Sequence, residues 1–400
     1  MAAQLQSSAS RSWPFWPAVP LYPYGKRRTL RQEVVKETIW TFDQCQGIFY
    51  VAVPIRMTVV RLEAGGLLVY APVAPTQECV SLMRELEATY GQVKYIILPT
   101  VSAIEHKVFV GPFARRFPQA QVFVAPNQWS FPLNLPLNWL GFPLSRTTFL
   151  PSDSAQSPFA DEFDYALLGP INLNLGPYAE AAFFHRRSQT LLVTDAVMSI
   201  PHDPPAILQA DPYPLLFHAR DDAHEAIADT PANRIKGWHR IALFTFYFRP
   251  SVLSVVGLGK TLQNAFKAPN RSKKAYFGLY PFRWQADWPQ CFEKLRGQGR
   301  LFVAPILQGL IFNRGPQAVL GWADAIAQWP FQRVIPCHLD CPIAASPAEF
   351  RRAFEFLEKP AAAATSDNAF LPEVDFAVIR QLDQRLNQTG LTPPAEVNWP

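Results

Sequence analysis

The chain has 400 residues and a formal net charge of +5, and its residues are 49% hydrophobic and 17% charged. This composition excludes an intrinsically disordered chain, because so apolar a sequence can bury a large core. The small positive charge argues against a dedicated nucleic-acid-binding protein, so no nucleic-acid partner is expected.

Five scattered cysteines and the lack of an apolar leader favour a reducing compartment and argue against secretion. We expect a cytoplasmic protein, or a plastid protein if the source is a plant or an alga. A short plastid-type transit segment stays open because of Ser7, Ser8, Ser10 and Arg11.

Residues 1–37 are expected to form an N-terminal extension. Tryptophan, tyrosine and proline recur between residues 13 and 24, a composition typical of an extended strap over a hydrophobic surface. The chain has 39 prolines against 19 glycines, which predicts many stiff connections.

The β-strand pattern begins at Thr38. Residues 57–62 and 66–70 flank a glycine-containing turn and predict a hairpin. Thr76 and Gly91 are predicted to bound a helix, because the apolar positions between them have helical spacing. These positions are Val80, Met83, Leu86 and Tyr90.

A short apolar run at residues 95–98 predicts a buried strand that Pro99 ends. The expected loop at residues 100–106 ends with Glu105 and His106. A short helix over residues 108–117, a strand at 121–124 and a proline-rich loop at 126–160 should follow.

A second block of strands is predicted at residues 181–184 and 190–193, a hairpin whose second strand ends at Asp195. The most apolar run, residues 241–258, is expected to be buried core. Arg249 and Pro250 interrupt it, and a bilayer span needs about 20 uninterrupted apolar residues. The less favoured alternative is a weak contact with a membrane surface, for which the 238–283 segment supplies basic and aromatic residues.

The last third should be regular α/β structure. We expect a strand at residues 301–304, a helix at 319–329 and a strand at 333–336 that ends at His338. Ser346 and Glu349 predict a capping box at the start of another helix. The domain organisation is therefore expected to be a main domain over residues 38–360, with an insertion around 200–300, and a linker and C-terminal helix over 361–400.

Potential ligands follow three of the predicted strands: Glu105 with His106, then Asp195, then His338. Strand ends are a usual place for a site in α/β folds. Glycine-rich phosphate loops, a GxSxG elbow and zinc-finger spacing are all missing from the sequence.

This order of residues resembles the metallo-β-lactamase superfamily. Its motif Thr-His-x-His-x-Asp-His falls on residues 100–106 without gaps, with Thr100 and His106 kept and Glu105 in place of the aspartate. Residues 191–197 resemble the strand that delivers a bridging aspartate, here Asp195. Residues 333–338 resemble the strand that delivers the final histidine, here His338.

More narrowly, the chain resembles an uncharacterised family of cyanobacteria and plants, domain of unknown function 4336, over most of residues 35–360. The resembling segments are Lys236-Gly237-Trp238, Tyr247-Phe248-Arg249-Pro250-Ser251, Val303-Ala304-Pro305-Ile306-Leu307 and Trp329-Pro330-Phe331. The resemblance implies an α/β fold, an αββα sandwich of two mixed sheets flanked by helices, with strand-end loops around one cleft.

The sequence departs from the superfamily pattern at one of its two metal sites. Two of the three histidines of that site are Val101 and Ala103 here, and the third position falls near Gly176. His185 is not a convincing replacement, and Ala71 stands near the usual bracing aspartate. The resemblance therefore implies that this site is lost.

The second site keeps a possible ligand set, Glu105, His106, Asp195 and His338, which suits one zinc, iron or manganese ion. Three function hypotheses follow. The favoured one is a non-catalytic or altered-activity binding or scaffold protein. The alternatives are a mononuclear metal-dependent hydrolase that uses these four residues and a peripheral membrane-surface protein. No catalytic residue is assigned.

Overall fold

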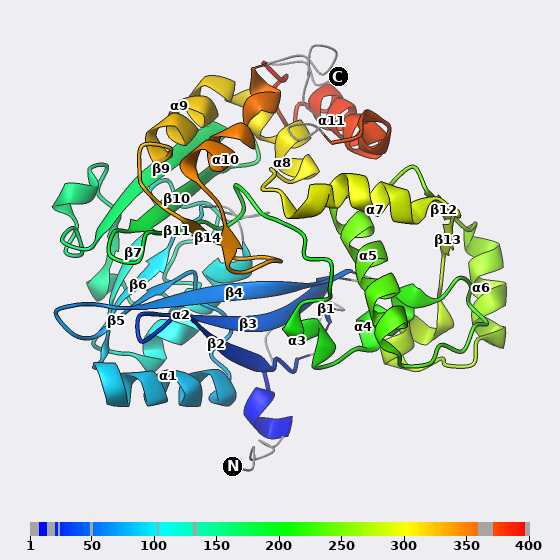
Figure 1. The fold of residues 1–400 in the computed structure, drawn as a ribbon, viewed down its shortest axis with the longest axis horizontal. Coiled ribbons are helices and arrows are strands. Elements are labelled where there is room, and N and C mark those ends of the chain that lie inside the picture. The colour runs from blue at the N-terminus through cyan, green and yellow to red at the C-terminus, as the bar shows by residue number, and fades with distance from the viewer. Residues whose placement is uncertain are drawn as a thin grey trace.

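The computed structural model of the protein describes residues 8–13, 21–22, 25–48, 51–101, 104–130, 134–358 and 371–396. Two mixed β-sheets pack face to face, and helices cover both outer faces (Figure 1). The αββα sandwich expected from the sequence is thereby confirmed.

The first sheet has eight strands in the order β1-β3-β4-β5-β6-β7-β8, with β2 also paired to β3. The strands up to β5 are antiparallel neighbours, and β5 to β8 run parallel. Their bounds are β1 (Leu21–Tyr22), β2 (Thr29–Val35), β3 (Ile39–Ile48), β4 (Val51–Arg61), β5 (Leu67–Tyr70), β6 (Val93–Leu98), β7 (Gln121–Val124) and β8 (Thr147–Phe149).

The second sheet has five strands in the order β15-β14-β11-β10-β9. Only β11 and β14 are parallel neighbours, and they pair with Leu192 opposite Ile335. The bounds are β9 (Phe163–Asn172), β10 (Pro177–His185), β11 (Thr190–Leu192), β14 (Arg333–Ile335) and β15 (Ile343–Ala344). The predicted hairpin that leads to Asp195 is β10 and β11.

Successive side chains of each strand point to opposite faces of its sheet, and this divides the core into layers. Along β4, Met57 and Val59 face the helices α1 (Gln77–Tyr90) and α2 (Ile104–Arg116), whereas Val60 faces the second sheet. Phe183 of β10 packs in the same inter-sheet layer as Val60. The outer face of the second sheet is covered by α9 (Pro316–Ile326) and α10 (Pro347–Arg352), so each sheet is buried on both faces.

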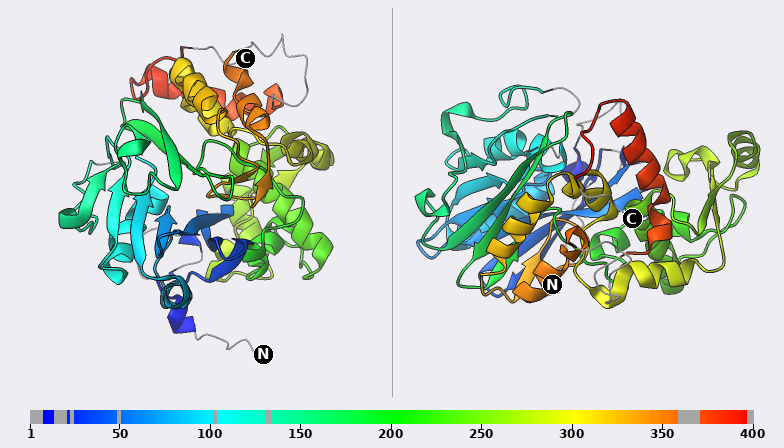
Figure 2. Two further views of the ribbon diagram at one scale, coloured as in Figure 1. Left: turned by 60° about the vertical axis from the view of Figure 1, so that its left-hand side comes forward. Right: turned by 90° about the horizontal axis from the view of Figure 1, so that it is seen from above.

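A mainly helical lobe lies between β11 and β14 and projects from one end of the sandwich (Figures 1 and 2). Its own small core forms around Phe217, Tyr280 and Phe282. Its elements are α3 (Ala206–Gln209), α4 (Tyr213–Ala219), α5 (Pro231–Tyr247), β12 (Leu253–Val255), α6 (Leu258–Lys267), the 3₁₀ helix η4 (Lys273–Gly278), β13 (Phe282–Trp284) and α7 (Trp288–Arg296).

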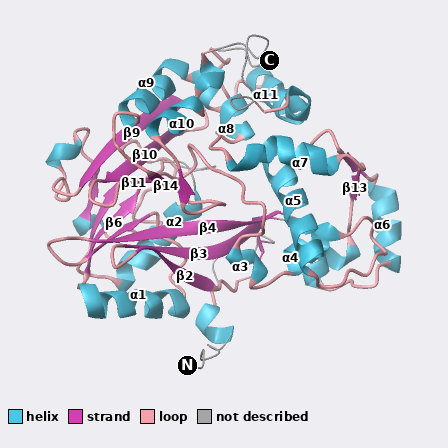
Figure 3. Cartoon of the chain, viewed as in Figure 1, coloured by secondary structure: helices cyan, strands magenta, loops and turns pink. Residues whose placement is uncertain are grey.

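The chain then returns to the sandwich through α8 (Pro305–Leu310), and a last helix, α11 (Ala377–Gln388), packs beside α8 (Figure 3). Arg314 holds this end of the chain, because its guanidinium pairs with Asp383 and donates to Asn387 Oδ1 at 2.9 Å. The linker predicted at 361–368 lies outside the described residues.

The helix starts that the sequence predicts from capping residues are confirmed. Thr76 Oγ1 accepts from the Cys79 amide at the start of α1. Ser346 and Glu349 form the capping box of α10. Trp13 of the aromatic strap packs edge-on against Phe109 of α2, with ring centroids 5.7 Å apart. Leu21–Tyr22 of the strap form β1, and residues 14–20 and 23–24 lie outside the described residues.

Three local expectations were wrong. Residues 301–304 are no sheet strand, because only Phe302 forms an isolated bridge, with Met198. The loop expected at 100–106 is shorter, since α2 already begins at Ile104. Within the expected N-terminal extension, Thr29–Val35 forms the edge strand β2, in which Gln32 and Glu33 are exposed.

Candidate functional site

The topology brings the four predicted site residues to neighbouring strand ends. Glu105 and His106 lie in the first turn of α2, just after β6. Asp195 follows β11, and His338 follows β14. Because β11 and β14 are parallel neighbours, their carboxyl ends lie at one edge of the second sheet.

His338 stands between two carboxylates. Its Nε2 lies 3.2 Å from Asp195 Oδ1 and 3.4 Å from Glu105 Oε2. The side chains of His338, Asp195 and Glu105 are 14%, 25% and 38% exposed, so the cluster is open to solvent on the Glu105 side.

Both histidine rings are oriented by backbone carbonyls. Nδ1 of His338 lies 2.9 Å from the Pro54 oxygen, and Nδ1 of His106 lies 3.1 Å from the Pro72 oxygen. A carbonyl only accepts, so each Nδ1 carries the proton and Nε2 is the atom left for the site.

His106 is the most enclosed of the four residues. Its ring is buried, its centroid lies 6.4 Å from that of His338, and its Nε2 has no hydrogen-bond partner within the described residues. Burial lowers the pKa of His106 to about 4, and the positive charge of His338 adds to the shift. His106 is therefore neutral at pH 7.

Burial and the neighbouring charges shift the pKa values of His338, Glu105 and Asp195 in different directions. Burial alone would lower the pKa of His338, but the hydrogen bond to Asp195 and the negative charges of Glu105 and Asp195 outweigh it and raise the pKa to about 9. Burial raises the pKa of Glu105. Burial would also raise the pKa of Asp195, yet the hydrogen bond and the charge of His338 hold it below its usual value. At pH 7 His338 is thus an imidazolium paired with carboxylates.

Glu180, a buried residue of β10, holds the loop that carries Asp195. Its Oε1 accepts from the Thr194 amide at 2.7 Å, and its Oε2 accepts from the amides of Asp195 and Ala196 at 3.1 and 3.0 Å. The Tyr178 hydroxyl donates to the same Oε2 at 2.9 Å. Burial and the charge of Asp195 raise the pKa of Glu180 to about 7.

Arg56, a buried residue of β4, holds the loop that carries His338. Its guanidinium donates to the carbonyls of Pro336 and Leu339 at 2.8 and 2.9 Å and pairs with Asp43. Each loop of the site is therefore fixed by one buried charged side chain.

Sequence reasoning missed both Glu180 and Arg56. Each is a charged residue inside an apolar stretch of its strand, flanked by Ala179 and Ala181 or by Ile55 and Met57. A buried charge needs partners, so a lone charge in a buried strand is the signal that could have identified them.

The Val101 position, where the superfamily motif has its first histidine, is buried and largely apolar. Val101 is fully buried with Ala125 and Ala179, and the Lys107 amine donates to the Val101 carbonyl at 2.9 Å and to the Trp129 carbonyl at 2.6 Å. Burial lowers the pKa of Lys107 to about 8. Ala103 lies outside the described residues.

Gly176 and His185, the two places considered for the third histidine, bring no ligand to the cluster. A Cβ on Gly176 would lie 2.3 Å from the Trp129 ring. His185 is at the opposite end of β10, where its Nδ1 contacts Ser188 Oγ at 2.7 Å.

The residues present suit a single metal ion by their chemistry. Two neutral imidazole Nε2 atoms and two carboxylates are donors that zinc, iron and manganese accept. Tetrahedral metal bonds of about 2.0–2.2 Å separate ligand atoms by about 3.3–3.6 Å, close to the two contacts of His338. Among the described residues, however, no group of three or more His, Cys, Asp or Glu side chains is already gathered as a metal centre.

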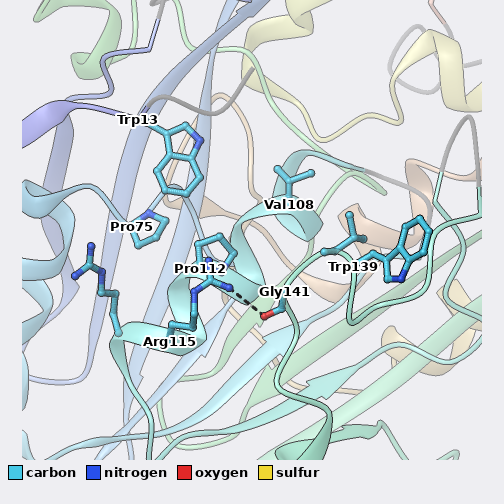
Figure 4. A pocket seen from close by; sticks show the side chains of 9 residues that line it. Trp13, Pro75, Val108, Pro112, Arg115, Trp139 and Gly141 are labelled. Carbon is cyan, nitrogen blue, oxygen red and sulfur yellow. Dashed lines mark hydrogen bonds between the residues drawn. The ribbon is translucent and has the colours of Figure 1, made fainter. Parts of the chain in front are cut away.

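A groove of about 720 Å³ lies elsewhere, beside the C-terminal half of α2 (Figure 4). It is lined mainly by Trp13, Pro112, Arg115 and Trp139, and Arg115 Nη1 donates to the Gly141 carbonyl at 3.3 Å across it. None of the four cluster residues lines this groove.

Comparison with solved structures finds matches of low similarity. A metal-soaked flavodiiron core from Synechocystis sp. PCC6803 is 10% identical with a TM-score of 0.40, over 84% of this chain and 62% of that one. A flavoprotein from Thermotoga maritima is 7% identical with a TM-score of 0.40, over 82% of this chain and 60% of that one. A metallo-β-lactamase from Pontibacter korlensis is 12% identical with a TM-score of 0.35, over 82% of this chain and 99% of that one.

The chain thus spans less than two thirds of the flavodiiron and flavoprotein chains. Because their TM-scores are low, these structures assign no role to any residue of this chain. The fold is assigned from the sheet topology. Comparison with curated proteins found no match. The family model described as Domain of unknown function (DUF4336) matches residues 36–356, and the chain therefore belongs to this family.

Proposed function

We propose that the protein binds one divalent transition-metal ion through Glu105, His106, Asp195 and His338, and that it works as a one-metal protein of altered activity. The observation that carries the proposal is the orientation of the two histidines. Each ring donates Nδ1–H to a backbone carbonyl, which leaves Nε2 as the ligand atom, and Nε2 of His106 has no partner within the described residues. Such a buried, oriented nitrogen is a usual feature of metal ligands.

The roles of the chain's own residues follow from their contacts. Asp195 and Glu105 would supply oxygen ligands, and binding would displace the proton from His338 Nε2. Glu180 and Arg56 would position the ligands without touching the ion. A bound ion would supply Lewis-acid chemistry at the solvent-open side near Glu105.

Two-metal hydrolysis is not part of the proposal. Val101 has no ligand atom, and its surroundings are apolar apart from the Lys107 amine. A cationic amine bonded to backbone carbonyls at this place disfavours a second cation nearby.

Metal analysis of the purified full-length protein tests the proposal. After incubation with zinc, manganese or ferrous iron and desalting, we expect close to one equivalent of one of these metals. An Asp195→Ala/His338→Ala variant should lose it. The matched control is Asp203→Ala/His202→Ala, because this exposed Asp–His pair lies outside the cluster. Equal metal content in both variants would contradict the site.

A second candidate function is a metal-free binding scaffold. It is favoured by the pairing of the His338 imidazolium with two carboxylates, which satisfies these three side chains without an ion. On this hypothesis the protein contains no metal, and its melting temperature does not change when a chelator is added. That pair of results would replace the first proposal with the second.

A further inference from the structure

The strongest feature outside the strand-end cluster is the outer face of α6. Leu258, Leu262 and Phe266 recur at intervals of four residues and lie along one side of this helix. Their side chains are 74%, 46% and 77% exposed. A monomer rarely leaves such a row of large apolar side chains in water without a use for it.

The helix is held in place by its other side. Thr261 and Ala265 are buried, and η4 packs against α6. Phe277 of η4 and Val255, just before α6, add two more exposed apolar side chains to this surface. We call the five side chains Val255, Leu258, Leu262, Phe266 and Phe277 the α6 face.

The chain segment that carries the α6 face has charges of one sign. Residues 230–286 contain ten Lys and Arg residues and no Asp or Glu. Three of the ten, all on α5, form ion pairs with Asp229 and Asp221. The other seven come after α5, and Lys260, Lys267, Arg271 and Arg283 among them are exposed.

The position of α6 leaves this surface accessible. The helix forms the far edge of the helical lobe, at the end of the molecule away from the sandwich, in Figure 1 and in the right-hand view of Figure 2. A flat surface can therefore reach α6 without meeting the sandwich first.

Two residues expected to take part in a membrane contact are not at the surface. Trp238 and Arg240, counted among the residues of a membrane contact, are buried in α5, where Arg240 pairs with Asp221. Their burial excludes them from any surface contact. Of the 238–283 segment, only α6 and the residues next to it are then candidates for a membrane contact.

We propose that the α6 face docks the protein on an anionic lipid surface. An amphipathic helix with an apolar stripe and flanking lysines lies in the plane of a bilayer interface, with its apolar side chains among the acyl chains and its cations near the headgroups. Among the helices of the described residues, none combines the length and hydropathy needed to span a bilayer. Docking through such a helix is peripheral.

Anionic lipid fits this surface better than a protein partner of mixed charge. The stretch of 57 residues without an acidic side chain offers no complement to basic groups on a partner, whereas a layer of anionic headgroups meets every cation on it. The apolar side chains also stand in a row along one helix, as entry into a planar interface requires.

Co-sedimentation of the full-length protein with vesicles tests the proposal. We expect binding to phosphatidylcholine vesicles that contain phosphatidylglycerol, weak binding to phosphatidylcholine alone, and weaker binding as salt is raised. The Leu258→Gln/Leu262→Gln/Phe266→Gln variant should lower the partition coefficient by about tenfold or more. Lys260→Gln/Lys267→Gln/Arg271→Gln should lower it as well and reduce its salt dependence.

The matched control is Trp139→Gln, which removes a side chain that is 74% exposed beside α2, away from the lobe. It should bind vesicles like the unchanged protein. Absence of binding to anionic vesicles, or equal binding by the apolar variant, would overturn the proposal. If the unchanged protein instead dimerises in sedimentation and the apolar variant does not, the face belongs to a second copy and the lipid proposal is rejected.

Discussion

At the scale of single residues, the site depends on Glu180 as much as on the four candidate ligands. Glu180 gathers three successive amides of the Asp195 loop and the Tyr178 hydroxyl onto one buried carboxylate. A carboxylate can accept at both oxygens, whereas an amide side chain presents one donor group in place of an acceptor. The geometry of Asp195 therefore depends on a charge that does not belong to the ligand set.

We predict that Glu180→Gln lowers the free energy of unfolding by about 2 kcal/mol, because at least one buried amide then faces an NH₂ group. Urea denaturation measures this loss. The exposed Glu85→Gln variant is the control and should change the stability by less than about 0.5 kcal/mol. Metal affinity should fall in Glu180→Gln and stay unchanged in Glu85→Gln. A Glu180→Gln protein of unchanged stability would show that the carboxylate does not hold the loop.

The sequence could predict the four candidate ligands but not their support. Glu105, His106, Asp195 and His338 follow strands whose apolar runs are visible along the chain, so their meeting at strand ends could be expected. Arg56 acts across the fold, on a loop 280 residues away, so its contact depends on how the two sheets face each other, and one sequence does not specify it. Glu180 lies on β10 opposite the loop that continues β11, but the hairpin pattern alone does not show that its carboxylate turns inward to three successive amides.

At the scale of elements, the packing of α4 against α5 depends on Gly237. A Cβ at this position would lie 1.8 Å from the Leu215 carbonyl oxygen, so the two helices touch backbone to backbone. This gives a physical reason for a glycine within the Lys236-Gly237-Trp238 segment, although glycine weakens a helix interior by about 1 kcal/mol. The close contact fixes how α4 packs against α5 within the helical lobe.

We predict that Gly237→Ala lowers the free energy of unfolding by about 3 kcal/mol, because the methyl group forces α4 and α5 apart. Gly321→Ala in α9 is the matched control, since no atom lies within 4 Å of its added Cβ. It should raise the stability by about 1 kcal/mol through helix propensity alone. Thermal unfolding of both variants measures the difference, and similar effects in the two would refute the close contact.

Element boundaries show where the sequence signals were sufficient and where they were not. Capping residues such as Thr76 and Ser346 act on amides three residues away, so their helices could be located from the sequence. The apolar run at residues 301–304 looks like a strand, but its side chains are buried among helices of the lobe and the C-terminal part. An apolar run predicts burial, and tertiary partners decide whether it is a strand.

At the scale of the whole molecule, stability should depend on pH through buried neutral histidines. Burial lowers the pKa of His239 and of His185 to about 4. The His239 ring stacks on Phe292 with centroids 3.6 Å apart, and its Nε2 donates to the His202 carbonyl. In the unfolded chain these histidines titrate near pH 6.5.

A lowered pKa in the folded state favours the neutral form, so its contribution is complete above pH 6.5 and is lost as the pH falls toward 4. At pH 5 we expect each histidine to reduce the free energy of unfolding by about 2 kcal/mol. Urea denaturation at pH 7.5 and pH 5 measures the change. His239→Gln should lose less stability on acidification than the unchanged protein, whereas exposed His224→Gln should lose as much. An equal loss in all three proteins would contradict the role of His239.

The overall architecture could be predicted because hairpins, parallel strands and helices leave different periodicities in the chain. The hairpin of β4 and β5 and the buried strands β6 and β7 lie where apolar alternation and apolar runs placed them. The lobe between β11 and β14 is less regular, with short helices separated by prolines, so only its position could be expected. Its exposed α6 face became visible once burial was known for each side chain.

The uneven distribution of charge affects how the molecule is oriented as it diffuses toward a charged surface. Residues 206–296, which build the helical lobe, contain 13 Lys and Arg against seven Asp and Glu, a net charge of +6, which leaves −1 on the rest of the sequence. The lobe that carries these residues lies at one end of the longest axis (Figure 1). The protein is therefore an electric dipole, and the field of a negatively charged surface turns it during diffusion so that the lobe arrives first. That torque acts over about a Debye length, before any apolar side chain makes contact.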